Sequence, residues 1–482
     1  MNNKYDVVMG IEIHCELKTK TKCFSNAANT FGQKPNTQIN AIDCGYPGTL
    51  PTVNQAVIIM AIQTCTALKM NIDPLLRFDR KSYFYPDLPK GYQITQFFHP
   101  IGTNGELPIV VNNEEFIVSF ERLHIEEDTA KQIHNNKKTL LDYNRAGIPL
   151  LEIVTKPIFN TSEQVVAYIN TLRQLLIHLQ VSDAKMNEGS LRCDINISLK
   201  PHGSDILGTK VEIKNLNSTH NITLAINDEI NRQTNILNKK QKINLETRRF
   251  DEKTNKTVSM RSKENKIDYK YFPEPNIFPI QLDEKWIKMI AKNLPELPKE
   301  IMERLKKQYN LSTKDINLLI DKVEILTIFE QTVAINNLAL PTFNYLVGPV
   351  QAYCNTNNTT IKNSELTANN LSQLVSLVYE QKINDKQSKQ LLNAIMINSE
   401  KSPTDLIRTL GITLVSDSND LEKILITILK ANENMITIYK VNPEKAMKFF
   451  MGQLMKLTKG QANPQVSKEI LKKLIENYEA FM

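Results

Sequence analysis

Acidic and histidine side chains alternate with apolar ones in residues 10–17, near the start of the chain. Glu12, His14 and Glu16 fall on one side of an extended chain, and apolar residues occupy the other side. At ~3.3 Å per residue, the Cα atoms of Glu12 and His14 lie roughly 7 Å apart on one face, so both side chains can reach one cation. Taken alone, the pattern also fits an antiparallel strand with a solvated polar face.

Three later stretches show the same alternation, at residues 120–126, 190–199 and 208–214. Each has the two-residue period of a half-buried strand. Their polar positions are Arg122, His124 and Glu126; Arg192, Asp194, Asn196 and Ser198; and Lys210, Glu212 and Lys214. Acidic, amide and basic groups are therefore expected together on one face of a sheet.

A lone carboxylate, Glu152, lies in the otherwise apolar stretch 148–154. A buried charge of this kind is costly unless it is paired or bound to a metal. Metal binding is one interpretation, and a position at the sheet edge or an ion pair with Arg145 is the other. Glu127 follows the strand predicted at 120–126, where that strand should end.

These strands together predict an antiparallel sheet with one apolar face packed on helices and one polar face of mixed charge. Like charges on neighbouring strands repel, so such a face is unfavourable as plain surface. It is consistent with the floor of a cavity that holds a hard cation and a polyanion. Mg²⁺ prefers oxygen ligands and commonly shares its shell with substrate phosphates, while arginine and lysine neutralise transferred phosphate.

Basic and aromatic residues interleave in the segment from Arg77 to Gln93. Arg80, Lys81 and Lys90 lie among several phenylalanine and tyrosine residues. Such a segment suits phosphate groups together with a stacked base. A small aromatic core beneath a solvated charged loop explains the pattern equally well.

The chain has 482 residues and a net charge of +7, which permits a polyanionic partner without requiring one. This length exceeds that of a single core, so several domains are expected. Alternating strands, with a helix at 54–70, give way after residue 292 to amphipathic helices such as 315–328. The sequence therefore predicts an α+β chain. Its expected domains are a sheet domain at 1–292, a helical domain at 293–403 and a small helical tail domain at 404–482.

The absence of several common motifs argues against the function classes that depend on them. Neither common glycine-rich phosphate loop occurs, and there is no nucleophile elbow, so any use of ATP proceeds without a P-loop. The six cysteines form no C-x-x-C pair and are expected to be reduced, intracellular thiols. Neither a signal peptide nor a membrane span is expected.

Lysine dominates the segment from Lys440 to Lys473, which has eight lysines and two glutamates. The apolar stripe along residues 446–457 predicts an amphipathic helix there. A basic helical module suits contact with a phosphate backbone, with Lys456 and Lys459 as candidate contacts. A solvated lysine-rich face is the alternative.

Several longer blocks resemble one known family. They are GIEIH at 10–14, YPGTLP at 46–51, FDRKSYFYPDLPKGYQ at 78–93, LHIEED at 123–128, EGSLRCDIN at 188–196, EIKNLNS at 212–218, YFPEP at 271–275 and GQLMKLTKGQANP at 452–464. Through these blocks the chain resembles, from end to end, the GatB family, which supplies the B subunit of the aspartyl/glutamyl-tRNA(Asn/Gln) amidotransferase. The resemblance implies a sheet domain with a kinase-type site, a helical domain and a tail that contacts tRNA.

The resemblance also implies a reaction and partners. In the family, GatB acts in a heterotrimer with an amidase subunit, which releases ammonia from glutamine, and with a small third subunit. GatB activates Glu-tRNA(Gln), Asp-tRNA(Asn) or both with ATP and Mg²⁺, and ammonia then displaces phosphate to give the amide. A cytoplasmic location is implied as well.

Carried onto this sequence, the resemblance implies roles for individual residues. It assigns Glu12, His14, Glu127 and Glu152 to the Mg²⁺ site and to catalysis, with Glu126 as the alternative to Glu127. Histidine is an uncommon Mg²⁺ ligand, so His14 acts through water in one interpretation. The resemblance assigns contact with phosphates or with the acceptor end of tRNA to Arg80, Lys81 and Lys90, with Asp194 and Asn196 as second choices.

One departure from the family concerns zinc. Many members carry two pairs of cysteines as metal ligands, and the matching positions here are Ser25, Ala27, Asn40 and Asp43. Cys23 and Cys44 are each displaced from that pattern. Without thiolate pairs no structural zinc is expected.

Two rival hypotheses rank below this one. A non-catalytic tRNA adaptor accounts for the basic tail but leaves the polar sheet face unexplained. A free-standing ligase that joins a small carboxylate to an amine accounts for the polar face but leaves the basic tail unexplained.

Overall fold

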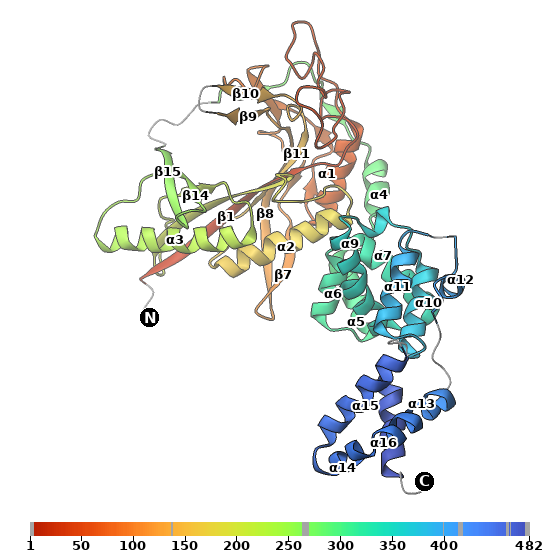
Figure 1. Cartoon of the computed structure of the whole chain (residues 1–482). Helices are drawn as coiled ribbons and strands as arrows, with labels where there is room; N and C mark the ends of the chain where they lie inside the picture. Colours follow the sequence, from red (N-terminus) through yellow and green to blue (C-terminus); the bar gives the residue numbers. More distant parts are fainter. Residues whose placement is uncertain are drawn as a thin grey trace. The chain divides into compact units, whose positions relative to one another are not determined.

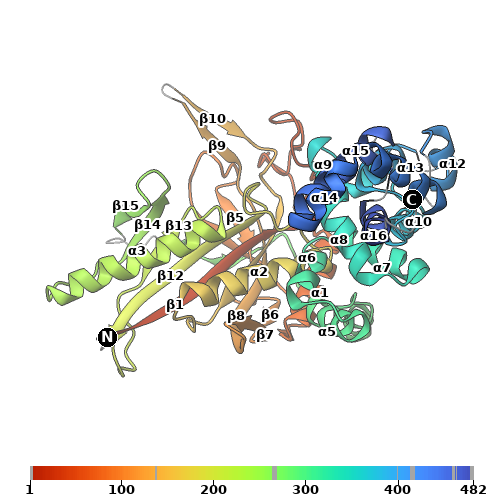
Figure 2. The same ribbon diagram turned by 60° about the horizontal axis from the view of Figure 1, so that its bottom comes forward.

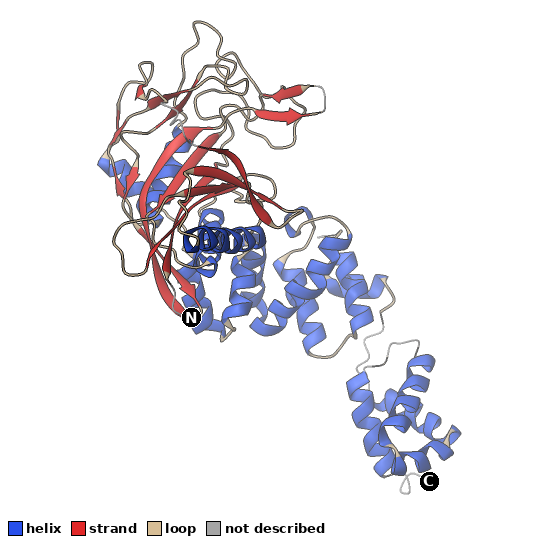
Figure 3. Cartoon of the chain, turned by 90° about the vertical axis from the view of Figure 1, so that its left-hand side faces the viewer, coloured by secondary structure: helices blue, strands red, loops and turns tan. Residues whose placement is uncertain are grey.

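The computed structural model of the chain describes residues 4–135, 138–262, 269–398, 400–412, 418–458, 462 and 464–477. They divide into two compact units, Met1–Pro298 and Lys299–Met482. The first unit is built on a sheet and the second is helical, as the colouring of Figure 3 shows. The predicted α+β class, with helical domains after a sheet domain, is confirmed.

A ten-stranded sheet forms the frame of the first unit. Its central strand β1 (Tyr5–Glu16) pairs antiparallel with β11 (Pro149–Thr155) on one side and with β12 (Leu191–Pro201) on the other. The remaining strands are β2 Asn71–Ile72, β6 Gly102–Thr103, β7 Glu106–Val111, β8 Glu114–Glu127, β13 Val211–Lys214, β14 Glu246–Asp251 and β15 Lys256–Ser262. Across the sheet the order is β15, β14, β13, β12, β1, β11, β8, β6 and β2, and β7 also pairs with β8.

One pair of neighbouring strands departs from the antiparallel sheet that the sequence predicts. β13 and β14 run parallel to each other, so the sheet is mixed. Helix α3 (Thr219–Asn238) lies between them in the chain and supplies the long connection that a parallel pair requires.

Alternation along the strands separates an apolar face from a polar one. Ile11, Ile13 and Cys15 are fully buried on the apolar face, whereas Glu12 and His14 are half-buried on the other. The expected division of this sheet into two chemically distinct faces is therefore present in the structure.

Helices α1 (Gln55–Ala67), α2 (Ser162–His178) and α3 belong to the layer on the apolar face. Figures 1 and 2 show α2 and α3 side by side along β1 and β12. The three helices are capped at their N-termini by the side chains of Asn54, Thr161 and Ser218, each of which accepts a hydrogen bond from a backbone N–H of the first turn. The helix predicted at 54–70 is confirmed as α1.

Short sheets and one helix complete the first unit around the main sheet. β4 (Asp79–Ser82), which carries Arg80 and Lys81, lies between β5 and β16 in a three-stranded sheet. In Figure 1 the β9–β10 hairpin stands on the opposite side of the main sheet from α2 and α3. The bounds are β3 Leu75–Leu76, β5 Tyr92–Thr95, β9 Lys131–His134, β10 Thr139–Asp142, β16 Phe272–Pro273, β17 Ile280–Gln281 and α4 Glu284–Lys292.

The second unit contains two separate hydrophobic cores. The first core involves α5 Pro298–Tyr309, α6 Thr313–Ile320, α7 Val323–Asn336, α8 Ala339–Tyr345, a π-helical turn Leu346–Val350, α9 Gln351–Thr356, a 3₁₀ turn Ile361–Asn363, α10 Ala368–Tyr379, α11 Asp385–Ile395 and α12 Pro403–Thr409. The second core involves α13 Ser418–Ala431, α14 Glu433–Val441, α15 Pro443–Leu457 and α16 Pro464–Glu476.

The boundaries in the structure lie later than the sequence analysis places them. Leu294 and Leu297 pack against the core of the first unit, which therefore extends beyond residue 292. Leu406 and Ile412 are buried in the first core of the second unit, so residues 404–412 pack with the helical domain rather than with the tail. The helix expected at 315–328 is two helices, because α6 ends at Ile320 and α7 begins at Val323.

All six cysteines are free thiols. Within the residues that the structure describes, no helix combines the length and the apolar character needed to cross a bilayer.

The assignment of the two faces makes a prediction about stability. Ile197 is fully buried on the apolar face, and its neighbour Ser198 faces the polar side. Ile197→Ala should lower the free energy of unfolding by about 2–5 kcal/mol, whereas Ser198→Ala, which removes a single buried hydroxyl, should lower it by about 1 kcal/mol or less. Urea unfolding followed by Trp286, the one tryptophan of the chain, measures both because this residue packs against the core of the first unit. Equal losses would contradict the assignment.

Candidate active site on the polar face of the sheet

Four side chains from three neighbouring strands meet on the polar face of the sheet. The strand register places His14 opposite Glu152 and Glu152 opposite His124. His14 Nε2 lies 3.3 Å from Glu152 Oε2 and 3.5 Å from Glu126 Oε1. His124 Nε2 lies 3.2 Å from the same Glu152 oxygen. We call His14, His124, Glu126 and Glu152 the histidine group.

Three carboxylates form a second group beside it. Glu12 lies opposite Asp194 of β12, and Glu212 comes from β13, the next strand. One oxygen of each lies within 4.8 Å of the other two. Lys214 pairs with Asp194 and, at 3.1 Å, with Glu212. Asn196 donates a hydrogen bond of 2.7 Å to Glu12 Oε1. We call Glu12, Asp194 and Glu212 the carboxylate group.

The two groups act on each other electrostatically. Burial raises the pKa of Glu12, and the negative charge of Glu152 raises it further. Burial by itself also raises the pKa of Glu152, but His124 and His14 outweigh it and hold that pKa well below the ordinary value. Burial lowers the pKa of His124, but Glu152 and Glu126 bring it to about 9. The negative charge on this face is therefore balanced by cationic neighbours.

Both groups offer donor sets that fit a divalent cation. In the histidine group, ligand atoms of His14, Glu126 and Glu152 lie within 4.8 Å of one another. Carboxylate oxygens are the protein ligands that Mg²⁺ prefers, and the carboxylate group consists of them alone. The polar face therefore offers neighbouring donor sets for two hard cations.

Glu127, the residue after Glu126 in β8, is held apart from the histidine group. Its carboxylate pairs with Lys90 and accepts a hydrogen bond of 3.0 Å from the backbone N–H of Ile94. Successive residues of a strand point to opposite faces, which separates the two neighbours. Of the two carboxylates considered for the metal site, the structure brings Glu126 to His14 and Glu152.

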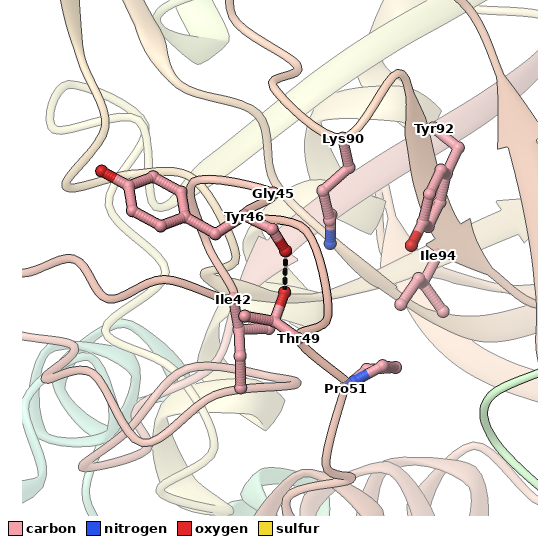
Figure 4. Close-up of a pocket in the computed structure, with 8 residues that line it drawn as sticks. All are labelled: Ile42, Gly45, Tyr46, Thr49, Pro51, Lys90, Tyr92 and Ile94. Carbon is pink, nitrogen blue, oxygen red and sulfur yellow. Dashed lines mark hydrogen bonds between the residues drawn. The ribbon is translucent and has the colours of Figure 1, made fainter.

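Lys90 also lines a small cavity of about 100 Å³. Figure 4 shows Lys90 and Tyr92 together on one side of this cavity, with Tyr46 and Thr49 across from them. Thr49 Oγ1 donates a hydrogen bond of 2.7 Å to the carbonyl oxygen of Tyr46, which fixes the loop there. Lys90 thus lines a hollow separate from the carboxylate group.

The basic residues Arg80 and Lys81 of β4 have different surroundings. Arg80 makes a two-pronged ion pair with Glu274, at 2.6 and 2.9 Å, and its guanidinium lies 3.8 Å from the centre of the Tyr92 ring. Lys81 Nζ lies 5.0 Å from the centre of the Tyr269 ring. Burial lowers the pKa of Lys81, but the negative charge of Glu126 outweighs it and the pKa is raised. Of the predicted basic set, Lys81 is the residue whose pKa responds to the charge of Glu126 and Glu152.

An aromatic cluster extends from Tyr269, the ring beside Lys81, to Tyr271, whose ring centre lies 6.0 Å from that of Tyr269. Phe97 and Tyr271 stack with their ring centres 3.8 Å apart, and Phe98 meets both rings edge-on. Phe97 and Phe98 are each about half exposed. The aromatic residues of this region therefore include exposed rings, in addition to the buried Phe78.

Comparison with known proteins decides the family. Residues 7–288 match the family model described as the GatB/GatE catalytic domain, and residues 327–475 match the GatB domain. The chain is 47% identical over 473 residues to the B subunit of the aspartyl/glutamyl-tRNA(Asn/Gln) amidotransferase of Mesoplasma florum, covering 98% of this chain and 99% of that protein. The chain belongs to the GatB family.

Other GatB proteins are similar at the same coverage. Proteins of the same name from Mycoplasma mycoides and Macrococcus caseolyticus are 46% and 41% identical to this chain, covering 98% of it and 99% of each relative. The histidine group and the carboxylate group both lie within the part that matches the catalytic domain.

The sequence analysis does not assign four residues of this region to the site. His124 and Glu212 are members of the two groups, and Lys214 and Arg122 contact them. All four lie at polar positions of the alternating strands, so the signal was present in the sequence. The alternating pattern does not specify the pairing register between strands, and this register decides which polar residues become neighbours.

Of the two tail lysines expected to contact tRNA, the structure describes one. Lys456 lies near the end of α15 and is exposed. Lys459 lies outside the described residues.

The region for which the sequence analysis expects no zinc contains a buried ion pair. Lys22 Nζ lies 3.3 Å from Asp43 Oδ2, and the side chains are 0% and 3% exposed. Ser25 donates a hydrogen bond of 2.7 Å to the other carboxylate oxygen, and the backbone N–H of Asn40 donates one of 3.0 Å to Oδ2. These donors include no thiolate and do not fit structural zinc.

A glycine makes room for this pair. Gly147 has a φ of +81°, and a Cβ there would lie 2.9 Å from Asp43 Oδ1. The ion pair, its hydrogen bonds and this glycine therefore hold the segment 22–43 against the sheet by direct contacts between protein groups.

Removal of the negative partner tests this arrangement. Asp43→Asn leaves the buried ammonium of Lys22 without a counter-charge and should lower the free energy of unfolding by about 3–5 kcal/mol. Asp183→Asn is the matched control, because its ion pair with Lys18 is largely exposed and should be worth less than ~1 kcal/mol. Urea unfolding followed by Trp286 measures both. Stoichiometric zinc in the purified protein would contradict the assignment.

Proposed function

We propose that this chain is the catalytic subunit of an ATP- and Mg²⁺-dependent ligase. It activates the side-chain carboxylate of Glu-tRNA(Gln), Asp-tRNA(Asn) or both, and converts it to the amide with ammonia. The observation that carries the proposal is the meeting of the histidine group and the carboxylate group on one sheet face. The family supports the substrate class, because the relatives are named as B subunits of aspartyl/glutamyl-tRNA(Asn/Gln) amidotransferases.

The chemistry explains why ATP is needed. A carboxylate is a poor acyl donor, because oxide is a poor leaving group. Its oxygen attacks the γ-phosphorus of ATP, the bond to the β–γ bridging oxygen breaks, and ADP leaves. Ammonia then attacks the acyl carbon, phosphate departs with the electron pair of the C–O bond, and the nitrogen loses a proton. Both steps require alignment and charge neutralisation more than a protein nucleophile.

The residues of the polar face suit these requirements. Glu12, Asp194 and Glu212 would hold one Mg²⁺, and His14, Glu126 and Glu152 a second, with His14 acting directly or through water. Bound Mg²⁺ supplies positive charge that neutralises the phosphate oxygens during transfer. Asn196 orients Glu12 through its hydrogen bond.

The basic residues take the remaining roles. Lys81 neutralises the transferred phosphate, since its ammonium interacts electrostatically with Glu126 and Glu152 of the histidine group. Arg80 and Lys90, each engaged in an ion pair with a glutamate, fix the loops that receive the acceptor end of tRNA. Lys456 and Lys459 contact the tRNA backbone from the tail.

Partners follow from the need for ammonia. The relatives are named as one subunit of an amidotransferase, which supports a complex of several subunits. We infer a heterotrimer with an amidase subunit, which releases ammonia from glutamine, and with a small third subunit. Because the product is used in translation, we place the complex in the cytoplasm.

Replacement of the metal ligands tests the catalytic role. In the complex with its amidase partner, Glu12→Gln or Glu152→Gln should reduce ATP-dependent amidation of Glu-tRNA or Asp-tRNA by at least about a hundredfold. Glutaminase activity of the partner should persist. Glu163→Gln, an exposed position at the start of α2, is the matched control and should amidate normally.

The rival functions give different results in this assay. Amidation at the wild-type rate in both site variants would make this chain a non-catalytic tRNA adaptor. ATP-dependent amidation of free glutamate, without tRNA, would make it a ligase for small molecules.

The tail can be tested by deletion. Removing residues 418–482 leaves Leu406 and Ile412 in the core of the helical domain. The truncated chain should show a KM for aminoacyl-tRNA raised at least about tenfold, since several phosphate contacts are lost, with glutaminase activity unchanged. An unchanged KM would contradict a tRNA-binding tail.

A further inference from the structure

Three aromatic side chains form a partly exposed platform in the first unit. Phe97 and Phe98 follow β5 in the chain, and Tyr271 directly precedes β16. The rings of Phe97 and Tyr271 are stacked at an interplanar angle of 12°, and Phe98 meets both rings edge-on. Phe97 and Phe98 are 51% and 50% exposed, and a contiguous exposed apolar patch of this kind commonly marks a binding site. We call Phe97, Phe98 and Tyr271 the aromatic platform.

Buried polar groups fix the position of this platform. The carboxylate of Asp79, which is 2% exposed, accepts a hydrogen bond of 2.9 Å from the backbone N–H of Phe98. Gln96 is fully buried, and its side-chain amide donates a hydrogen bond of 2.9 Å to the carbonyl oxygen of Arg77 and accepts one of 2.9 Å from the backbone N–H of Ile125. Because Ile125 lies in β8, next to a carboxylate of the histidine group, the segment that carries the two phenylalanines is anchored beside that group.

Two further observations place Tyr271 near the histidine group. Its ring centre lies 6.0 Å from that of Tyr269, and the Tyr269 ring centre lies 5.0 Å from Lys81 Nζ. Burial raises the pKa of Tyr271, the positive charge of Lys81 opposes this rise, and the negative charge of Glu152 adds to it. The aromatic platform therefore lies within the electrostatic field of the histidine group.

The chemistry of the substrate favours one occupant for this platform. In aminoacyl-tRNA the amino acid is esterified to the ribose of the terminal adenosine. When the side-chain carboxylate of the amino acid reaches the histidine group, the terminal base lies one amino acid and one ribose away from it. Single-stranded nucleic acids are bound by aromatic rings on which bases stack, together with positive charge for the backbone. The platform and the ammonium of Lys81 offer both, whereas an apolar protein surface would desolvate the ammonium without a compensating contact.

We propose that the aromatic platform stacks the terminal adenine of Glu-tRNA(Gln), Asp-tRNA(Asn) or both. This inference rests on the proposed function. Tyr271 covers one face of Phe97, the adenine lies on the other face, and Phe98 borders the base at its edge. Every tRNA ends in the same adenosine, so the platform fixes the ribose at one place whichever amino acid is attached. The side-chain carboxylate is then the part of the substrate that enters the histidine group.

Substitution of the stacking ring tests the proposal in the complete complex with the amidase partner. Phe97→Leu keeps an apolar side chain but removes the flat face, and it should raise the KM for aminoacyl-tRNA at least about fivefold. Phe97→Tyr keeps the face and should retain the wild-type KM. The KM for ATP and the glutaminase rate should stay at wild-type values in both variants. Phe278→Leu, which changes a phenylalanine that is 83% exposed between β16 and β17, is the matched control.

Fluorescence of the terminal base gives a readout that a merely structural role of Phe97 would not change. The probe is an uncharged tRNA(Gln) or tRNA(Asn) with 2-aminopurine in place of its terminal adenine, because stacking on an aromatic ring quenches this base. A saturating amount of the wild-type complex should quench the probe, and Phe97→Leu should quench it less, while Phe278→Leu matches the wild type. Urea unfolding followed by Trp286 checks that each variant is folded.

The outcomes distinguish this inference from the function on which it rests. An unchanged KM for aminoacyl-tRNA and unchanged quenching in folded Phe97→Leu, with amidation still lost in Glu12→Gln, would overturn the platform assignment and leave the ligase intact. Loss of the amidase subunit from the Phe97→Leu complex in gel filtration would overturn it too and assign the platform to the protein partner. ATP-dependent amidation of free glutamate by the wild type, without tRNA, would overturn both.

Discussion

Several carboxylates lie close together on one half-buried face of the sheet, although like charges repel each other. The structure of the first unit depends on overcoming this repulsion. Glu12, Glu152 and Glu126 are held there because β1, β8 and β11 each contribute an apolar row to the core on the other face. Burial of those rows fixes the register, and the register then fixes which acids are neighbours. The free energy that crowds the acids together therefore comes from the apolar side of the same strands.

The positive charges around this face differ in what they can do. His14, His124 and Lys214 lie within ion-pair distance of the acids and balance them in the protein alone. Burial by itself lowers the pKa of each, but the neighbouring carboxylates outweigh it and raise all three pKa values. The charged form of each group is therefore favoured by the acids it contacts. Under the proposed function, Mg²⁺ would add further positive charge to the same acids.

Alternation predicted the two faces of the sheet, because burial of every second residue is a local property of a strand. It did not decide between Glu126 and Glu127, since both stand at the end of β8, where the alternating pattern stops. The parallel pairing of β13 with β14 depends on the path of α3, and the residue pattern of a single strand carries no information about that path. The packing of residues 404–412 could not be predicted for a similar reason, because whether α12 packs on one core or another depends on contacts far apart in the chain. The tail assignment and the residue roles stay predictions.

The buried contact between Lys22 and Asp43 changes what this corner of the molecule depends on. A corner stapled by a metal is only as durable as the supply of that metal, and chelators or competing heavy ions can take it apart. Here an ion pair and two hydrogen bonds between groups of the polypeptide itself hold the corner. These contacts can therefore form as soon as this part of the chain folds.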